Sequence, residues 1–364
     1  MTRPTFAHID LDALRHNFTV AQKFAPNQKV MAMLKADAYG HGAEQAALAL
    51  NSYTDAIAVA FIDEAIALRE AGINKPITLL QGTFDEREIE LACQYSLDLV
   101  VLHGEQAEML EAAHPGCQLT VWLKFDSGMH RLGFSADEYA YWYERLSKHP
   151  NVAEVRLMTH FSCADEPENP VTKEQEALFD KKTKGLSCTT YSLANSAAIM
   201  AWPSTLRDWV RPGVMLYGVC PFADWRENHR DLRPVMTLKT VIISTRTLEA
   251  DEAVGYGRSW VASEKCRIGV ASIGYADGYP RCLPNGTPVL VNGQRVTMVG
   301  RVTMDMITLD LTGVADVKVG DEVTLWGEGL AVEEIAEYAG TIAYELLTGV
   351  SKRVPRIYHE ESSD

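Results

Sequence analysis

Short apolar runs alternate with helical stretches between residues 29 and 217 of this chain, and this alternation limits the possible folds more than any other feature. The runs are rich in Val, Ile and Leu, and the stretches between them have helical periodicity, as in residues 63–70. Eight runs can be counted, beginning near Lys29, Ala56, Ile77, Asp98, Leu119, Val155, Thr190 and Trp209. Eight consecutive strand–helix units predict an α/β fold, a closed (β/α)8 TIM barrel.

The pattern changes after about residue 230. Residues 235–243 and 289–296 are typical of strands, and Asn292-Gly293 is a strong hairpin signal. One late helix is expected near residues 332–339. The sequence therefore predicts a barrel domain in residues 1–230 and a mainly β domain in residues 231–364, connected by the polar stretch 221–232. Pairing of residues 1–10 with the second domain is left open.

Charge and cysteine content exclude several classes of function. A formal net charge of −15 disfavours nucleic acid and anionic membranes as partners, because an acidic surface repels both. The seven cysteines are widely spread without a Cys-x-x-Cys pair, which argues against a disulfide framework and a zinc site and favours core thiols. The first ten residues lack the features of a signal peptide, and no apolar run approaches a membrane span. We expect a cytoplasmic protein without a metal that acts on a small molecule.

Lys35 ends the first apolar run, in the segment Met31-Ala32-Met33-Leu34-Lys35-Ala36-Asp37-Ala38-Tyr39-Gly40-His41-Gly42. A lysine at the carboxyl end of a barrel strand lies on the catalytic face, where loss of hydration lowers the pKa of its amine and makes it nucleophilic. A Schiff-base lysine requires these properties. The simpler alternative is a solvated lysine at a strand end, and the residues that follow Lys35 argue against it.

The segment Lys-Ala-x-Ala-Tyr-Gly-His-Gly resembles the cofactor-lysine motif of alanine racemases, and further motifs of that family follow in order along essentially the whole chain. The resemblance implies a pyridoxal 5'-phosphate enzyme in which Lys35 holds the cofactor and is one of two catalytic bases. Tyr39 would hydrogen-bond the phosphate. Asp37 stands where the family usually has Asn, a change expected to alter local charge but to leave Lys35 and Tyr39 in place.

The segments after the seventh and eighth strands carry the expected phosphate site. In such barrels this site commonly forms from the loops after these two strands, with hydroxyl groups and free backbone amides. Ser196 and Gly213 fall there, beside Asn195 and Val214, and an N-cap role for residues 195–197 is compatible with it. By resemblance, Tyr344 also lies at the phosphate end.

Arg211 resembles the family's arginine at the pyridine nitrogen of the cofactor. A donor that is always charged disfavours protonation of that nitrogen, so the cofactor becomes a weaker electron sink than in transaminases. This limits reprotonation at the wrong carbon and favours racemisation. His160 matches a family histidine near the ring, although a purely structural packing role is left open.

The remaining site residues are also assigned by resemblance. Arg131 would bind the substrate, since a guanidinium holds a carboxylate in fixed geometry, and Lys124 matches a lysine that is often carbamylated. Tyr256 matches the second base, contributed across the interface of a homodimer with shared active sites. Further residues at the substrate end are Tyr275, Met304 and Asp305.

The implied function is the two-base interconversion of L- and D-alanine, an isomerase reaction that supplies D-alanine for peptidoglycan in the cell wall. One alternative is a non-catalytic cofactor carrier, which the residues after the barrel argue against. Another is an amino-acid decarboxylase, which is expected to have an acid in place of Arg211. Discrimination between alanine and serine, and between biosynthetic and catabolic roles, does not follow from the sequence.

Overall fold

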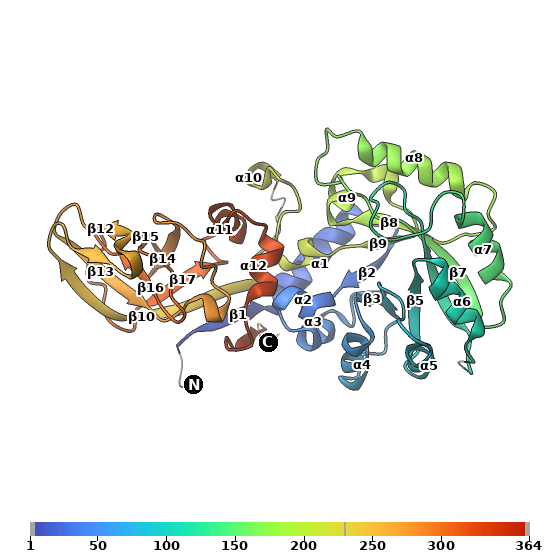
Figure 1. Ribbon diagram of the computed structural model, residues 1–364, viewed down its shortest axis with the longest axis horizontal. Coiled ribbons are helices and arrows are strands. Elements are labelled where there is room, and N and C mark those ends of the chain that lie inside the picture. Colours follow the sequence, from blue (N-terminus) through green and yellow to red (C-terminus); the bar gives the residue numbers. More distant parts are fainter. Residues whose placement is uncertain (1–3, 115, 229–230, 361–364) are drawn as a thin grey trace.

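Eight parallel strands close into a barrel in the order of the chain (Figure 1). The computed structural model describes residues 4–114, 116–228 and 231–360. Each barrel strand begins within three residues of an expected apolar run, so the predicted barrel is confirmed. The strands are β2 (Lys29–Met33), β3 (Ala56–Val59), β4 (Ile77–Leu79), β5 (Leu97–Val101), β6 (Leu119–Lys124), β7 (Val152–Met158), β8 (Tyr191–Asn195) and β9 (Trp209–Arg211).

Helices surround this barrel and explain why its strands lack an alternating pattern. All four residues of β3 are buried, as expected for a parallel strand covered on both faces. The α-helices of this part are α1 (Leu11–Phe24), α2 (Lys35–Gly40), α3 (Ala43–Leu50), α4 (Ile62–Glu70), α5 (Glu86–Gln94), α6 (Gly104–Ala112), α7 (Tyr139–Ser147), α8 (Val171–Thr183), α9 (Ser196–Ala201) and α10 (Trp225–Asn228). Two 3-10 turns, η1 (Pro203–Thr205) and η2 (Val214–Tyr217), flank β9. Within the described ranges, no helix is both long and apolar enough to cross a bilayer.

The second part of the chain is a mainly β unit. Its sheet has the order β13-β16-β15-β14-β17-β10-β1-β18, and β10 also pairs with β13, so six strands close on themselves. β1 (Phe6–Asp10) lies between β10 and β18 in this sheet. The other strands are β10 (Met236–Leu248), β11 (Ala253–Val254), β12 (Trp260–Val261), β13 (Cys266–Ala271), β14 (Pro288–Val291), β15 (Gln294–Val299), β16 (Ile307–Asp310), β17 (Glu322–Trp326) and β18 (Arg356–His359), with 3-10 turns η3 (Tyr256–Arg258) and η4 (Tyr275–Asp277).

The expected hairpin and late helix are both present in this unit. Asn292 and Gly293 connect β14 to β15 with φ of 49° and 76°, and a two-residue type I′ turn requires positive φ at both positions. Helix α11 (Val332–Ala339) occupies the expected range, but a second helix, α12 (Ala343–Gly349), follows it. The expectation of one late helix was wrong because seven residues are too few to show helical periodicity.

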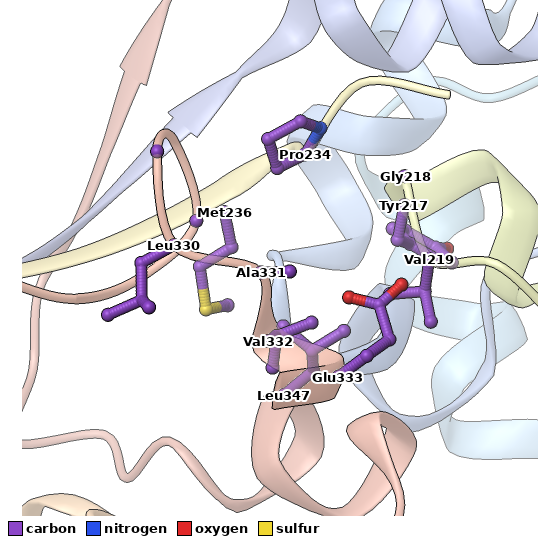
Figure 2. Close-up of a pocket in the computed structure, with 12 residues that line it drawn as sticks. Tyr217, Gly218, Val219, Pro234, Met236, Leu330, Ala331, Val332, Glu333 and Leu347 are labelled. Carbon is purple, nitrogen blue, oxygen red and sulfur yellow. The ribbon is translucent and has the colours of Figure 1, made fainter. Parts of the chain in front are cut away.

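The barrel and the β unit meet where α12 packs beside α2 (Figure 1). They also meet where α11 contacts the segment after η2. A cavity of about 210 Å³ lies at this junction, and Figure 2 shows the Glu333 carboxylate directed toward the backbone at Val219. The amide of Cys220 donates to Glu333 Oε1 at 2.9 Å. The other lining residues are apolar except for Tyr217, whose hydroxyl donates to the carbonyl of Met33 at 2.8 Å. This cavity therefore offers little chemistry.

The connecting residues 229 and 230, where the domain boundary was expected, lie outside the described residues, as do residues 1–3.

Two of the seven cysteines are joined to each other, although the sequence argues against a disulfide framework and favours core thiols for most of them. Cys93, at the end of α5, and Cys117, just before β6, form a disulfide, with Cα atoms 5.9 Å apart. Their spacing of 24 residues carries no signal in the sequence, because only the packing of α5 beside the start of β6 brings them together. Three of the other five, Cys188, Cys220 and Cys266, are buried thiols, as expected.

Asp98 links barrel stability to pH. It lies near the amino-terminal end of β5, 3.5 Å from Arg156 Nη1, and burial raises the pKa of its carboxyl group to about 6, with Arg156 acting in the opposite direction. The native state therefore holds this proton more tightly than the unfolded chain, and the stability it provides is lost as pH rises from about 4 through 6. Between pH 4.5 and pH 7.5 the wild-type protein should lose about 2 kcal/mol of unfolding free energy as Asp98 ionises. Asp98→Asn has no proton to lose, so its stability relative to wild type should rise by that amount.

Urea unfolding at the two pH values measures this difference. The exposed Glu90→Gln on α5 is the control for removal of one carboxylate. If the stability difference between Asp98→Asn and wild type does not change with pH, the pKa of Asp98 is not raised in the folded state.

Candidate active site

A cavity of about 1110 Å³ lies at the carboxyl ends of the barrel strands, and α12 forms part of its wall. Barrel enzymes carry their catalytic residues at this end. Eleven of the predicted site residues line the cavity: Lys35, Tyr39, Lys124, Arg131, His160, Asn195, Ser196, Arg211, Gly213, Val214 and Tyr344.

Lys35 lies one residue beyond strand β2, after Leu34, and begins a left-handed turn. Residues 36–39 all have φ between 52° and 54°, a conformation that costs a non-glycine residue roughly 1–2 kcal/mol. The turn is called α2 although its hand is opposite to that of an ordinary helix. Burial lowers the pKa of the Lys35 amine, and the positive charge of Arg131 lowers it further. The amine is therefore more readily available in its neutral, nucleophilic form than an exposed lysine.

Arg211 ends strand β9 and is fixed by protein acceptors. Its Nη1 donates to the carbonyl and hydroxyl oxygens of Ser192 at 2.8 and 2.6 Å, and its Nη2 donates to the carbonyl of Thr159 at 2.7 Å. Burial lowers the pKa of Arg211 to about 10, so the side chain stays charged at neutral pH. The guanidinium is thus held in one orientation at the cavity wall.

The Nδ1 atom of His160 lies 3.4 Å from the Nη2 atom of Arg211. A guanidinium has no acceptor, so His160 Nδ1 accepts in this contact and the ring is neutral, with its proton on Nε2. Burial lowers the pKa of His160 well below its usual value, and Arg211 and Lys124 act in the same direction. A packing role and a tuning role are both consistent with this arrangement.

Tyr39, Ser196 and Gly213 form one compact group. A Cβ at Gly213 would lie 2.7 Å from Tyr39 Oη, so only glycine fits there, and Ser196 Oγ accepts from the Gly213 amide at 2.8 Å. The Tyr39 ring stacks on Tyr217 with centroids 4.8 Å apart. Burial raises the pKa of Tyr39 to about 12, so its hydroxyl remains a donor. Hydroxyl donors beside a glycine suit a phosphate group.

Arg131 reaches the cavity from the loop after β6. Asp126 holds this loop by accepting from the amides of Gly128 and His130, both at 3.0 Å. Lys124, the last residue of β6, has its pKa lowered to about 8 by burial and then by Arg211 and Arg131. Such a lysine is partly neutral near physiological pH, as carbamylation requires.

Four predicted site residues do not line the cavity, namely Tyr256, Tyr275, Met304 and Asp305. Tyr256 is 74% exposed and Met304 is 53% exposed, while Asp305 pairs with Arg353 at 2.7 Å. In Figure 1, β12, close in sequence to Tyr256, lies at the opposite end of the molecule from the barrel. Within one chain, none of these four residues therefore lines the cavity that contains Lys35.

The structure also adds residues that the sequence did not indicate. Ser192 anchors Arg211, Glu64 accepts from the amide of Ala36 at 2.6 Å, and Asp165, Cys220 and α12 contribute to the cavity wall. Only Ser192 carries a signal, as a hydroxyl beside the apolar pair Leu193-Ala194 of β8. The others become visible only once distant segments are packed together.

The cations Lys35, Lys124, Arg131 and Arg211 line the same cavity as the group formed by Tyr39, Ser196 and Gly213. At the carboxyl end of a barrel, a desolvated lysine with this set of cations and hydroxyl donors is typical of enzymes that use a phosphorylated, carbonyl-bearing cofactor.

Comparison with known proteins gives the family. The profile for "Alanine racemase, N-terminal domain" matches residues 9–221, and that for "Alanine racemase, C-terminal domain" matches residues 235–358. The chain is 47% identical over 356 residues to "Alanine racemase, biosynthetic" of Pseudomonas aeruginosa, covering 98% of this chain and 99% of that protein. It is equally similar, at 47% with the same coverage, to "Alanine racemase, catabolic" of Pseudomonas putida. The crystal structure of the P. aeruginosa biosynthetic enzyme superposes with a TM-score of 0.95, at 46% identity, covering 99% of this chain and 100% of that one. The chain belongs to the alanine racemase family.

Enzymes of this family depend on pyridoxal phosphate, and the residues present fit that cofactor. Because Gly213 has no side chain, the space beside Tyr39 Oη and the Ser196 hydroxyl stays open, whereas a Cβ at this position would fill it. The cations of the cavity complement the charge of a phosphate and of a substrate carboxylate.

Helix α3 has Gly42 as its N-cap residue, so its first amide is bound by a more distant side chain, that of Asp37, the departure from the usual Asn. Asp37 Oδ1 accepts from the amide of Ala43 at 2.8 Å, and asparagine offers the same acceptor. Asp37→Asn should therefore change the unfolding free energy by less than about 0.5 kcal/mol, whereas Asp37→Ala should lower it by about 1 kcal/mol. Urea unfolding of both variants tests this. Equal losses in the two variants would mean that the negative charge facing Arg356, and not the acceptor, is what matters.

Proposed function

We propose that this chain interconverts L- and D-alanine with pyridoxal phosphate held by Lys35. The observation that carries the proposal is that Lys35, with its lowered pKa, and the immobilised Arg211 line one cavity. A decarboxylase would require an acid where Arg211 stands, and a carrier would not require the β unit that the family's C-terminal profile matches.

When bound, the cofactor withdraws electrons from the α-carbon of the substrate and so acidifies the α-hydrogen. The protein supplies orientation and proton transfer. The phosphate end of the cofactor would be held by Tyr39, Asn195, Ser196, Gly213, Val214 and Tyr344. Arg211, a charged donor backed by carbonyl oxygens, would keep the pyridine nitrogen unprotonated, with His160 behind it.

Inversion requires a proton donor or acceptor on each face of the substrate. Lys35 Nζ would move the proton on one face. Tyr256 of the partner subunit would act on the other, with Tyr275, Met304 and Asp305 nearby. The exposure of Tyr256, Tyr275 and Met304 supports this division. The segments of Tyr275 and Met304 lie side by side, since the amide of Ala276 donates to the carbonyl of Met304 at 3.1 Å, and large side chains exposed together are typical of an interface. Arg131 would orient the substrate carboxylate, and carbamylated Lys124 would fix Arg131.

We also infer that the barrel domain ends near residue 230. Work in the cytoplasm and supply of D-alanine for peptidoglycan stay predictions from the sequence. The relatives named biosynthetic and catabolic are equally similar to the chain, so identity does not separate those two roles.

The purified protein with cofactor should convert L-alanine to a mixture of enantiomers, and chiral chromatography measures this for each L-amino acid tested in turn. Borohydride should fix the cofactor to the peptide that contains Lys35, because only an amine linked to the cofactor carbonyl is reduced in this way. Lys35→Ala should lose both activity and label. Label on another lysine would refute the assignment of Lys35, and failure to racemise any amino acid would refute the function.

Mixing two inactive variants tests whether the active site is shared between subunits. Lys35→Ala and Tyr256→Phe homodimers should each be almost inactive, because each lacks one base in both sites. A mixed dimer collects both wild-type residues in one site and both mutations in the other. With random exchange of equal amounts, about half the dimers are mixed and about one quarter of all sites should regain full activity.

Mass spectrometry confirms the exchange of subunits before activity is measured. If exchange is complete and activity stays at the level of the separate variants, both residues act from the same chain and the shared site is ruled out.

A further inference from the structure

The left-handed turn after Lys35 must be stabilised by contacts from outside the turn. Ala36, Asp37, Ala38 and Tyr39 are not glycine, yet all four have φ above 50°. Because isolated residues rarely adopt this conformation and consecutive ones still less, surrounding contacts must stabilise it. The turn sets the direction in which Lys35 leaves the barrel wall, so whatever holds the turn also holds the lysine.

Glu64, in the first turn of α4, provides such a contact from the neighbouring strand–helix unit. Its Oε1 accepts from the amide of Ala36 at 2.6 Å. Its Oε2 accepts from the amides of Ala60 and Phe61 at 2.7 and 3.1 Å. Both oxygens are thus engaged by backbone donors, which fixes the carboxylate in position.

Two of these contacts are ordinary helix capping, and the third is not. A glutamate at the third position of a helix commonly accepts from the amide of the N-cap residue, here Phe61. Capping gives no reason for a contact with Ala36, which lies 28 residues away and directly follows Lys35. Among the charges that act on the Lys35 amine, Glu64 opposes the effect of Arg131 and Arg211.

We propose that Glu64 is a positioning residue for Lys35: its carboxylate ties the first amide of the left-handed turn to helix α4 and so fixes the lysine at the cavity. The proposal rests on the proposed function for the importance of Lys35, but the contact itself concerns only the backbone. It predicts that loss of Glu64 loosens residues 35–40 and impairs proton transfer without weakening substrate binding.

Glu88 on α5 offers a matched control. It occupies the same third helical position, and its Oε2 accepts from the amide of Phe84 at 2.8 Å, in the next strand–helix unit along the chain. No contact of Glu88 with the turn after Lys35 is found among the described residues. Removal of Glu88 therefore reproduces the loss of a helix cap alone.

Hydrogen–deuterium exchange of the holoenzyme, read by mass spectrometry, measures the hold directly. In Glu64→Ala, the peptide covering residues 35–40 should exchange about ten-fold faster than in wild type, and in Glu64→Gln, which keeps one acceptor, by less. In Glu88→Ala, that peptide should be unchanged. In steady-state kinetics, Glu64→Ala should lower kcat by about ten-fold and leave KM for alanine within about two-fold, and Glu88→Ala should alter neither.

Unchanged exchange of residues 35–40 in Glu64→Ala would overturn the proposal, as would faster exchange with wild-type kcat. If Glu64→Ala does not fold, Glu64→Gln gives the same comparison. A wild-type protein that does not racemise alanine would refute the proposed function, while the exchange comparison would still decide whether Glu64 holds the turn.

Discussion

Closure of the barrel between β2 and β9 is the interaction on which the site depends. Lys35 follows the first barrel strand and Arg211 ends the last, so only their parallel pairing makes them neighbours. The amide of Met33 donates to the carbonyl of Pro212 at 3.0 Å, which extends this pairing to the level of the cavity. Because all eight strands run the same way, every carboxyl end lies on one face. Residues at or directly after the ends of all eight strands then line one cavity although they are far apart in sequence.

Four cations around one cavity would repel each other if all stayed charged and unpaired. The protein meets this cost in two ways. Burial and the neighbouring cations lower the pKa of Lys35 and of Lys124, so both lysines shed their charge more easily than exposed ones. Arg211 keeps its charge but is surrounded by carbonyl and hydroxyl oxygens. The same arrangement that limits repulsion leaves Lys35 able to accept a proton and makes the cavity receptive to a phosphate and a carboxylate.

The sequence predicted the barrel well because buried parallel strands leave continuous apolar runs, and it predicted the residues that line the cavity through short motifs at strand ends. It could not predict α12, whose seven residues show no periodicity, or the disulfide of Cys93 and Cys117, which depends on packing. It also could not predict the left-handed turn, since Ala36 and Ala38 have no preference for positive φ. Glu64 was missed for a related reason: in sequence it is an ordinary capping glutamate, and its contact with Ala36 exists only in the closed barrel.

The turn after Lys35 is held from the β unit as well as from the barrel. Arg356 donates from Nε to the carbonyl of Gly40 at 3.0 Å, and a side chain at Gly40 would collide with the backbone at Leu347 in α12. Gly40 has φ of 84°, which glycine adopts without strain. The same segment therefore connects Lys35 to the helix that carries Tyr344 and to the strand that pairs with β1. Any shift of α12 against the barrel must displace this turn. The β unit thus contributes to the site of its own chain by holding Lys35 in register, in addition to any residue that it offers to a partner.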